Sequence, residues 1–294
     1  MTDAILARAS RRALVLDGAM ATELHATDGP PAPAPACDGL SVSEPARVRR
    51  IHDAYLRAGA DIVRTNTFRA AAREHERTAH ALCAASARLA REAADEWSRR
   101  TPGHVRFVAG ALGPGDEIAS RARVRDAYRA PLRALLDGRV DLVLFETWYC
   151  PAQTAGALQA VADAAADANH MVPVVLSVTL DASGRLPVSG AAVDDVLAAI
   201  DPSTIAGLGV NCGAGFDGLE DALIALRRHA PLVTCHPSAG LPDPHGRYPH
   251  APAGFADRVA SLAVRGLADI VGGCCGTTPA HIEALARAVA AGTQ

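Results

Sequence analysis

Eight short apolar segments alternate with amphipathic segments along nearly the whole chain. Short apolar runs separated by helical stretches are typical of parallel strands that are buried on both faces. The apolar segments span residues 13–18, 60–66, 105–113, 141–147, 173–180, 206–212, 231–237 and 269–275. The amphipathic segments cover residues 44–59, 73–97, 122–137, 153–169, 192–200, 217–229, 254–267 and 279–291. Eight strand–helix units in 294 residues predict an α/β fold, a (β/α)8 TIM barrel, with residues 1–294 as a single domain.

A doubly wound open sheet is the alternative arrangement of such units. In that fold a glycine-rich, phosphate-binding loop follows the first strand, and this chain has no such loop after residues 13–18. We therefore expect the closed barrel, in which catalytic groups lie at the carboxyl ends of the strands.

The segment after the first predicted strand interrupts the alternation. Residues 26–39 read ATDGPPAPAPACDG and contain four prolines. We expect no helix here, because proline removes a backbone donor, and the segment is too stiff to be a flexible linker. It is expected to form a long loop on the carboxyl face of the barrel. The loop either covers part of the site or is a surface insertion without a role.

Charge and composition exclude several classes of partner. The formal net charge is −3 and no basic stripe is present, so the usual signature of a nucleic-acid-binding protein is missing. No apolar stretch is long enough for a membrane span, and residues 1–20 lack the apolar core of a signal peptide. Seven cysteines without an export signal indicate a reducing, cytoplasmic location, where cysteines act as thiols or ligands.

Polar residues, thiols and glycines gather at the predicted carboxyl ends of the strands, where apolar residues would suffice for packing. Such an accumulation at this end of a barrel is the pattern expected of an active site. The segments are Asp17-Gly18-Ala19-Met20, Thr65-Asn66-Thr67-Phe68, Gly113-Pro114-Gly115-Asp116, Glu146-Thr147, Ser177-Val178-Thr179, Asn211-Cys212-Gly213, His236-Pro237 and Gly272-Gly273-Cys274-Cys275-Gly276.

Three cysteines stand out among these residues. Cys212 ends the sixth predicted strand, and the neighbours Cys274 and Cys275 end the eighth, so a barrel brings their thiols to one rim. Adjacent cysteines can hardly form an unstrained disulfide. Three thiolates match a tetrahedral Zn²⁺ ion whose fourth position is left for a ligand, and the flanking glycines let the chain turn sharply. The alternatives are three buried free cysteines, or a structural zinc site closed by Cys235.

The charge of such a ligand set indicates the chemistry. Three thiolates give the zinc unit a net charge of −1, so it is a poor activator of water compared with zinc on three neutral histidines. It can still hold an incoming thiol as a thiolate, because a metal-bound thiol loses its proton at neutral pH. A thiolate is the nucleophilic form of sulfur. The set therefore points to alkyl transfer onto a substrate sulfur.

Motifs along nearly the whole chain carry a resemblance to one family. They are DGAMATEL (17–24), AYLRAGADIVRTNTF (54–68), VAGALGP (108–114), FET (145–147), VNCG (210–213), HPSAGLPDPHGRY (236–248) and IVGGCCGTTPAHI (270–282). The chain resembles the zinc-dependent homocysteine S-methyltransferase family, most closely the homocysteine-binding module of cobalamin-dependent methionine synthase. The resemblance implies a (β/α)8 barrel, a Zn²⁺ cofactor, and L-homocysteine as the methyl acceptor that becomes methionine.

The resemblance also implies roles for individual residues. Cys212, Cys274 and Cys275 fall on the metal ligands of the family. Asp17 and Glu146 fall on carboxylates that meet the amino-acid end of homocysteine.

Physical chemistry adds detail to these assignments. A carboxylate such as that of Glu146 can bind the ammonium of homocysteine. The carboxylate of homocysteine can be bound by the backbone N–H groups around Gly18 and Ala19 or by Thr67. Asn211 stands beside the first metal cysteine, as in the family. Ser177 is either a substrate contact or a small polar filler of the barrel, as is Thr179.

Three features depart from the family pattern. Ala21 stands where the family generally has glycine, and Ser238 replaces an asparagine that is usual in the methionine-synthase module. The proline-rich segment has no counterpart that we can align. These departures leave the metal ligands untouched but leave open another small thiol or a selenol as the acceptor. Cys37, Cys83 and Cys150 are interpreted as thiols without a role.

The methyl donor is not determined by these motifs. The chain ends soon after the last predicted helix, so we expect the donor to diffuse in or to arrive on another protein. The candidates are a methyl-corrinoid protein, S-methylmethionine, S-adenosylmethionine and a betaine-like onium compound. A barrel that binds zinc and thiol without catalysis is a further alternative.

Overall fold

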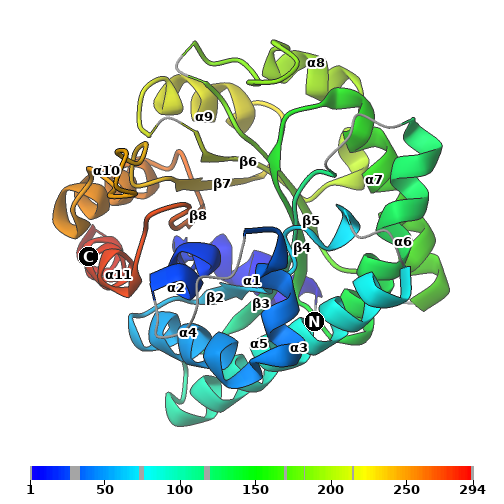
Figure 1. Cartoon of the computed structure of the whole chain (residues 1–294). Coiled ribbons are helices and arrows are strands. Elements are labelled where there is room, and N and C mark those ends of the chain that lie inside the picture. Colours follow the sequence, from blue (N-terminus) through cyan, green and yellow to red (C-terminus); the bar gives the residue numbers. More distant parts are fainter. Residues whose placement is uncertain are drawn as a thin grey trace.

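Eight parallel strands form one sheet in the computed structural model, which describes residues 2–26, 34–72, 76–115, 120–168, 171–181, 183–213 and 215–292. Along the sheet β1 lies next to β8, and the order then descends to β2. A parallel bridge between Leu16 and Ile62 brings the two ends of the sheet together and closes the barrel (Figure 1). The strands are β1 (Leu14–Val15), β2 (Ile62–Arg64), β3 (Phe107–Leu112), β4 (Leu142–Trp148), β5 (Val174–Val178), β6 (Gly207–Cys212), β7 (Leu232–Pro237) and β8 (Ile270–Val271).

Helices connect the strands and form the outer ring of the barrel (Figure 1). Each amphipathic segment of the sequence contains or overlaps one of them. They are α4 (Pro45–Arg57), α5 (Glu76–Arg100), α6 (Arg121–Asp137), α7 (Pro151–Ala168), α8 (Val193–Ala198), α9 (Leu219–Arg227), α10 (Pro252–Val264) and α11 (Pro279–Gly292). The predicted (β/α)8 barrel is confirmed, and the open doubly wound sheet is excluded. No helix in the described ranges is both long and apolar enough to cross a membrane.

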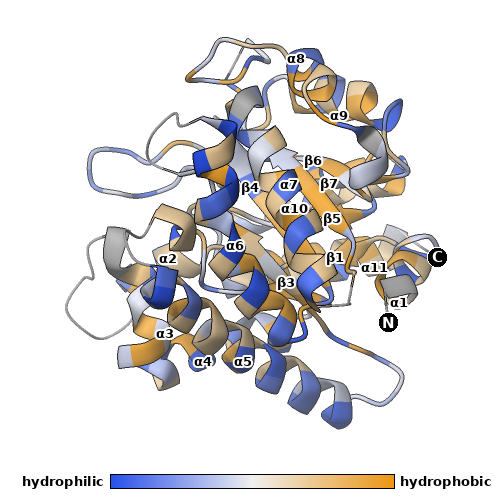
Figure 2. Ribbon diagram, turned by 90° about the vertical axis from the view of Figure 1, so that its right-hand side faces the viewer, coloured by the Kyte–Doolittle hydropathy of each residue, from blue (hydrophilic) through white to orange (hydrophobic). Residues whose placement is uncertain are grey.

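The strands are apolar throughout because they have two buried faces. On β4, Val143 and Phe145 pack into the core between sheet and helices, whereas Leu142 and Leu144 belong to a second core inside the barrel. Successive side chains of a strand point to opposite faces, so both sets must be apolar. Figure 2 shows the result: hydrophobic strands at the centre and hydrophilic residues on the outer surfaces of the helices.

One helix precedes the barrel and was not predicted. Helix α1 (Thr2–Ala9) places Ile5 and Ala9 in the inner core together with Phe107, Leu232 and Ile270. These strand residues lie at or near the amino-terminal starts of their strands, so α1 covers that end of the barrel. The helix has only eight residues, and the alternation of strands and helices contains no signal for an element before the first strand.

The proline-rich segment differs from its prediction in one respect. Helix α2 (Met20–Ala26) follows β1, residues 27–33 lie outside the described ranges, and Ala34–Gly39 form a 3-10 helix, η1, which continues into α3 (Leu40–Ser43). The exclusion of helix was therefore wrong for Ala26 and for residues 34–39. Pro35 is tolerated because the N–H groups in the first turn of a helix have no partner within it.

Candidate metal centre

A cavity of about 300 Å³ opens at the carboxyl ends of the strands, where the sequence predicted a site. Its wall combines the segments that follow β1 and β2, the end of β4, the last residue of β6 and the turn after β8. The lining residues are Ala19, Met20, Ala21, Thr22, Cys37, Asp38, Arg64, Thr65, Asn66, Thr67, Phe68, Arg69, Glu146, Thr147, Cys212, Cys274 and Cys275. Cys37 and Asp38 belong to η1, so the end of the proline-rich segment forms part of this wall.

The three cysteines singled out in the sequence meet in this cavity. The sulfur atoms of Cys212, Cys274 and Cys275 all lie within 4.8 Å of one another. Cys212 and Cys275 are 63 positions apart in the chain, yet their Sγ atoms are 3.7 Å apart. Strands β6 and β8 both neighbour β7 in the sheet, and this arrangement brings their carboxyl ends to one place.

Unusual backbone geometry surrounds two of these thiols. Cys212 has a φ of 58°, a left-handed conformation that is strained for a residue with a side chain. Gly276, directly after Cys275, has a φ of 78°, and a Cβ there would lie 2.1 Å from the ring of Tyr248. Only glycine fits at this position. Tyr248 therefore packs directly on the turn that carries Cys275.

Backbone hydrogen bonds hold the middle cysteine. The N–H of Cys274 donates to the carbonyl of Pro237 at 2.8 Å, and the hydroxyl of Thr277 donates to the carbonyl of Cys274 at 2.7 Å. The turn after β8 is thus tied to the end of β7 and to the start of α11.

The chemistry of the three sulfurs fits a bound cation. The contact with Cys274 raises the pKa of Cys212 to about 12, and the contact with Cys212 raises the pKa of Cys275 to about 12, with burial adding to both. For Cys274, the contact with Cys212 lowers the pKa, but Cys275 and burial outweigh it and the pKa is raised. Three thiolates at these separations need a compensating positive charge, which a divalent metal ion supplies.

Asn211 links the metal-ligand candidates to β4. Its Oδ1 accepts hydrogen bonds from the N–H of Thr147 at 2.8 Å and from the hydroxyl of Ser177 at 2.7 Å. Its Nδ2 donates to the hydroxyl of Thr147 at 2.8 Å and to the sulfur of Cys274 at 3.9 Å. Thr147 has a φ of 64° beside an irregularity in the β4–β5 pairing. Asn211 and Ser177 lie behind the cavity wall, so they position Thr147 and Cys274.

A buried arginine joins the two carboxylates predicted to meet the substrate. Arg64, at the end of β2, donates from Nε to Asp17 Oδ1 at 2.8 Å and from Nη1 to Glu146 Oε2 at 2.7 Å. Its backbone N–H donates to Asp17 Oδ2 at 2.9 Å. Its Nη2 donates to the carbonyls of Gly18 and Gly273, each at 2.7 Å. One side chain thus connects the ends of β1, β2 and β4 with the residue before Cys274.

The two carboxylates differ in their ionisation. Burial raises the pKa of Asp17 to about 6, against the opposing effect of Arg64. Burial also disfavours the ionised form of Glu146, but Arg64 and His236 outweigh it and lower its pKa to about 2. His236 Nε2 lies 3.4 Å from Glu146 Oε2, and burial lowers the pKa of this histidine. At neutral pH both carboxylates are therefore negative, His236 is neutral and Arg64 is positive.

The groups predicted to meet a substrate carboxylate are partly engaged. The N–H of Ala19 donates to the hydroxyl of Thr277 at 3.2 Å. The hydroxyl of Thr67 donates to the carbonyl of Ala111 at 2.7 Å. Ala19 and Thr67 line the cavity, whereas Asp17 and Gly18 are not among its lining residues. At Gly18 an added Cβ would lie 2.7 Å from the hydroxyl of Thr277, so glycine is needed here for close packing.

Comparison with known proteins agrees with this geometry. A family model described as homocysteine S-methyltransferase matches residues 14–289, from the first strand to the last helix. The chain belongs to this family. It is accordingly a methyltransferase.

Solved structures of one relative match this chain over nearly its full length. The metallated form of the homocysteine methyltransferase MmuM from Escherichia coli is 28% identical, with a TM-score of 0.78, and the match covers 97% of this chain and 98% of the other. The apo form of the same enzyme is 28% identical with a TM-score of 0.74, covering 94% and 96% of the two chains.

Arg64 is the main residue of this cavity that the sequence did not single out. It lies within the quoted segment AYLRAGADIVRTNTF, but no role was assigned to it. A signal was present, because an arginine at the end of an apolar strand that is buried on both faces needs a partner. The identity of that partner depends on strands distant in sequence.

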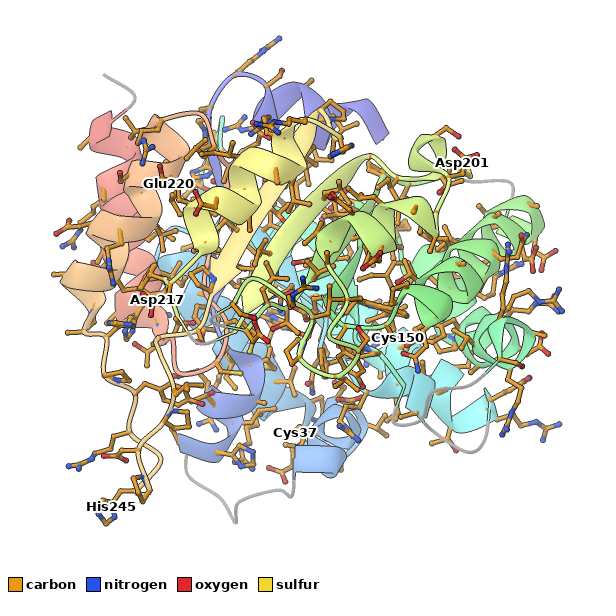
Figure 3. The ribbon with its side chains drawn as sticks, turned by 90° about the horizontal axis from the view of Figure 1, so that it is seen from above. Cys37, Cys150, Asp201, Asp217, Glu220 and His245 are labelled. Atoms are coloured by element: carbon orange, nitrogen blue, oxygen red, sulfur yellow. The ribbon has the colours of Figure 1, made fainter. Side chains whose placement is uncertain are left out.

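In the described ranges the other cysteines do not belong to the group of three sulfurs. Cys235 is fully buried in the core between sheet and helices. Cys37 on η1 and Cys150 directly before α7 occupy separate places in the molecule (Figure 3). Cys37 lines the cavity, a position that its interpretation as a thiol without a role did not anticipate.

Proposed function

We propose that this chain transfers a methyl group to the sulfur of L-homocysteine and forms methionine, with a zinc ion held by Cys212, Cys274 and Cys275. The observation that carries the proposal is the presence of three convergent sulfurs and a carboxylate, Glu146, in one cavity of about 300 Å³. This volume lies at the lower end of the range of small-molecule sites, which suits an amino acid with a short side chain.

Three sulfur donors support zinc as the metal. Sulfur ligands favour zinc over the hard cations magnesium and calcium, and three protein ligands leave a position for a substrate atom. A bound zinc would lower the pKa of the acceptor thiol, so that its sulfur is a thiolate at neutral pH. In the reaction the thiol gives up its proton to solvent, its sulfur forms a bond to the methyl carbon, and the bond between methyl and donor breaks with its electron pair left on the donor.

The residues of the chain would bind and orient the acceptor. Glu146 lines the cavity as a carboxylate and would receive the ammonium of homocysteine. The backbone around Gly18 and Ala19, together with Thr67, would face its carboxylate. Asp17 and Asn211 would act behind this layer, Asp17 through Arg64 and Asn211 through Thr147 and Cys274. Ser177 would hold Asn211.

We take residues 1–294 as one functional domain.

For the methyl donor we propose two classes. A methyl-corrinoid protein would dock on the carboxyl face, where Cys275 is exposed. A small sulfonium, S-methylmethionine or S-adenosylmethionine, would enter the cavity directly. Another small thiol or a selenol as acceptor is a narrower variant of the same chemistry. Free thiols at a metal site also fit a reducing compartment such as the cytoplasm.

Two measurements test the proposal. Purified protein is assayed for methionine with homocysteine and each donor in turn, and zinc is quantified per chain. X-ray absorption at the zinc edge is then recorded with and without homocysteine. We expect about one zinc per chain and an added sulfur neighbour when homocysteine binds. A coordination shell that homocysteine leaves unchanged would contradict the proposal and favour a structural zinc site.

A further inference from the structure

The buried charged side chains at and behind the cavity wall carry more negative than positive charge. Asp17 and Glu146 carry two negative charges at neutral pH, and Arg64 between them carries one positive charge. The net charge of this trio is therefore −1. The nearest further titratable group, His236, is neutral, since burial lowers its pKa. All four side chains are buried.

Arg64 engages both carboxylate oxygens of Asp17. One oxygen of the Asp17 carboxylate accepts from Arg64 Nε and the other from the Arg64 backbone N–H. The aspartate is only 1% exposed and lies behind the cavity wall. Asp17 therefore does not contact a ligand in the cavity. It affects such a ligand only because its negative charge cancels the positive charge of Arg64.

Arg64 engages Glu146 at one oxygen only. Arg64 Nη1 donates to Glu146 Oε2, and His236 approaches the same oxygen. In the described part of the chain no hydrogen bond is formed by Oε1, although Glu146 lines the cavity. Because Glu146 lines the cavity and its Oε1 keeps its acceptor capacity, this oxygen can accept a hydrogen bond from a ligand.

We propose, resting on the proposed function, that Arg64 is a specificity-determining residue that makes this site select a thiol with one ammonium group. By neutralising Asp17 it leaves one net negative charge, which is available at Glu146 Oε1. A zwitterionic amino thiol supplies one ammonium and restores neutrality there. A thiol of the same length without the amino group leaves a buried negative charge uncompensated, which is unfavourable.

The test compares two ligands that differ in the amino group alone. L-Homocysteine and 4-mercaptobutyrate are titrated by calorimetry into the zinc-loaded protein without a methyl donor. For the unaltered protein we expect homocysteine to bind about ten to a hundred times more tightly, the range for a hydrogen bond to a charged group. Equal affinities for the two ligands would overturn the inference.

Charge-matched variants identify the role of Arg64. Glu146→Gln and Asp17→Asn each bring the trio to a net charge of zero, and both should lower the preference for homocysteine by about tenfold or more. The double variant Arg64→Met with Asp17→Asn restores −1 on Glu146 and should recover the preference to within a few-fold. Circular dichroism and zinc content show that each variant is folded and loaded.

The outcomes separate this inference from the function on which it rests. A double variant that discriminates no better than Asp17→Asn would show that Arg64 does not act through charge, even if methylation of homocysteine is intact. A preference that survives Glu146→Gln would place the ammonium elsewhere and also overturn the inference. If neither thiol bound the unaltered protein, the proposed function would fail and the inference with it.

Discussion

Two arginine–aspartate clusters, each built around a buried aspartate, lie at opposite ends of the barrel. At the amino-terminal end, Asp61 accepts hydrogen bonds from Arg12 at 2.5 and 3.0 Å and from the N–H of Val15 at 2.9 Å, and contacts His104 at 2.6 Å. These contacts join the segments that begin β1, β2 and β3. At the carboxyl end, Arg64 joins Asp17 to Glu146.

The two clusters differ in how completely their charges are balanced. Arg12 balances the negative charge of Asp61, and although burial raises the pKa of Asp61, the hydrogen bonds with His104, Arg12 and the N–H of Val15 outweigh it and lower this pKa to about 2. At the carboxyl end two carboxylates share one arginine, and one of them lines a cavity. A buried ion pair by itself does not indicate a ligand-binding site. An unbalanced charge next to a cavity indicates one.

The largest expected effect comes from removing a sulfur at the carboxyl end. In Cys274→Ala we expect zinc content to fall from about one ion per chain to near zero and methionine formation to be lost, because two thiolates hold the metal poorly. Metal analysis, turnover and circular dichroism measure this. Cys235→Ala is the matched control, because this thiol lies in the core away from the three sulfurs. Activity retained in Cys274→Ala would refute the metal assignment.

Acid sensitivity should come from a group outside both clusters. Burial lowers the pKa of His52 to about 4, and both ring nitrogens lack a hydrogen-bond partner in the described structure. Below pH 6.5, the pKa of this histidine in the unfolded chain, the unfolded chain binds a proton at His52 and the folded chain does not. Stability therefore falls as pH drops from 6.5 to about 4, by roughly 3 kcal/mol at most.

The variant His52→Leu should remove this part of the pH dependence. Urea unfolding at pH 7.5, 5.5 and 4.5 measures the change, and His229→Leu at an exposed position is the control. Identical slopes for His52→Leu and the unaltered protein would show that another group governs acid unfolding. Asp61 contributes to the pH dependence of stability in a different range. Because its pKa is lowered in the folded protein, its stabilisation is lost only as the pH falls from 3.8 toward 2.

Breaking the amino-terminal cluster should affect stability alone. Asp61→Asn leaves Arg12 without its charge partner, and we expect the free energy of unfolding to fall by about 2 kcal/mol. This is less than for a fully buried pair because Arg12 is about one-third exposed. Zinc content and the dissociation constant for homocysteine should stay unchanged. A loss of homocysteine affinity as large as that of Asp17→Asn would erase the distinction between the two clusters.

The smallest effect is expected behind the metal centre. Ser177→Ala removes one of two hydrogen bonds to Asn211 Oδ1, while the bond from Thr147 remains. We expect stability to fall by about 1 kcal/mol and kcat by a few-fold, with no loss of zinc. Steady-state kinetics and metal analysis check this. A complete loss of activity would mean that Ser177 contacts the substrate itself.

Much of the fold and the meeting of the three cysteines could be predicted from local patterns. The eight apolar segments contain or overlap the eight strands, and the three cysteines meet because neighbouring parallel strands place their carboxyl ends together. The errors occurred where local signals were weak or ambiguous. Helix α1 is short and precedes the alternation, and the prolines of residues 26–39 hid a 3-10 helix that tolerates Pro35 in its first turn.

The sequence by itself determined the barrel, its order of strands and the convergence of Cys212, Cys274 and Cys275. Side-chain periodicity is a local property, and in a parallel barrel the carboxyl ends of the strands that it predicts all lie at one rim. Only the tertiary structure decided which charges meet. The partners of Arg64 come from the segment after β1, from β4 and from the turn after β8, so they are known only once the barrel has closed. Electrostatic balance depends on distances across the fold, and those distances place Asp17 behind the cavity wall and Glu146 in it.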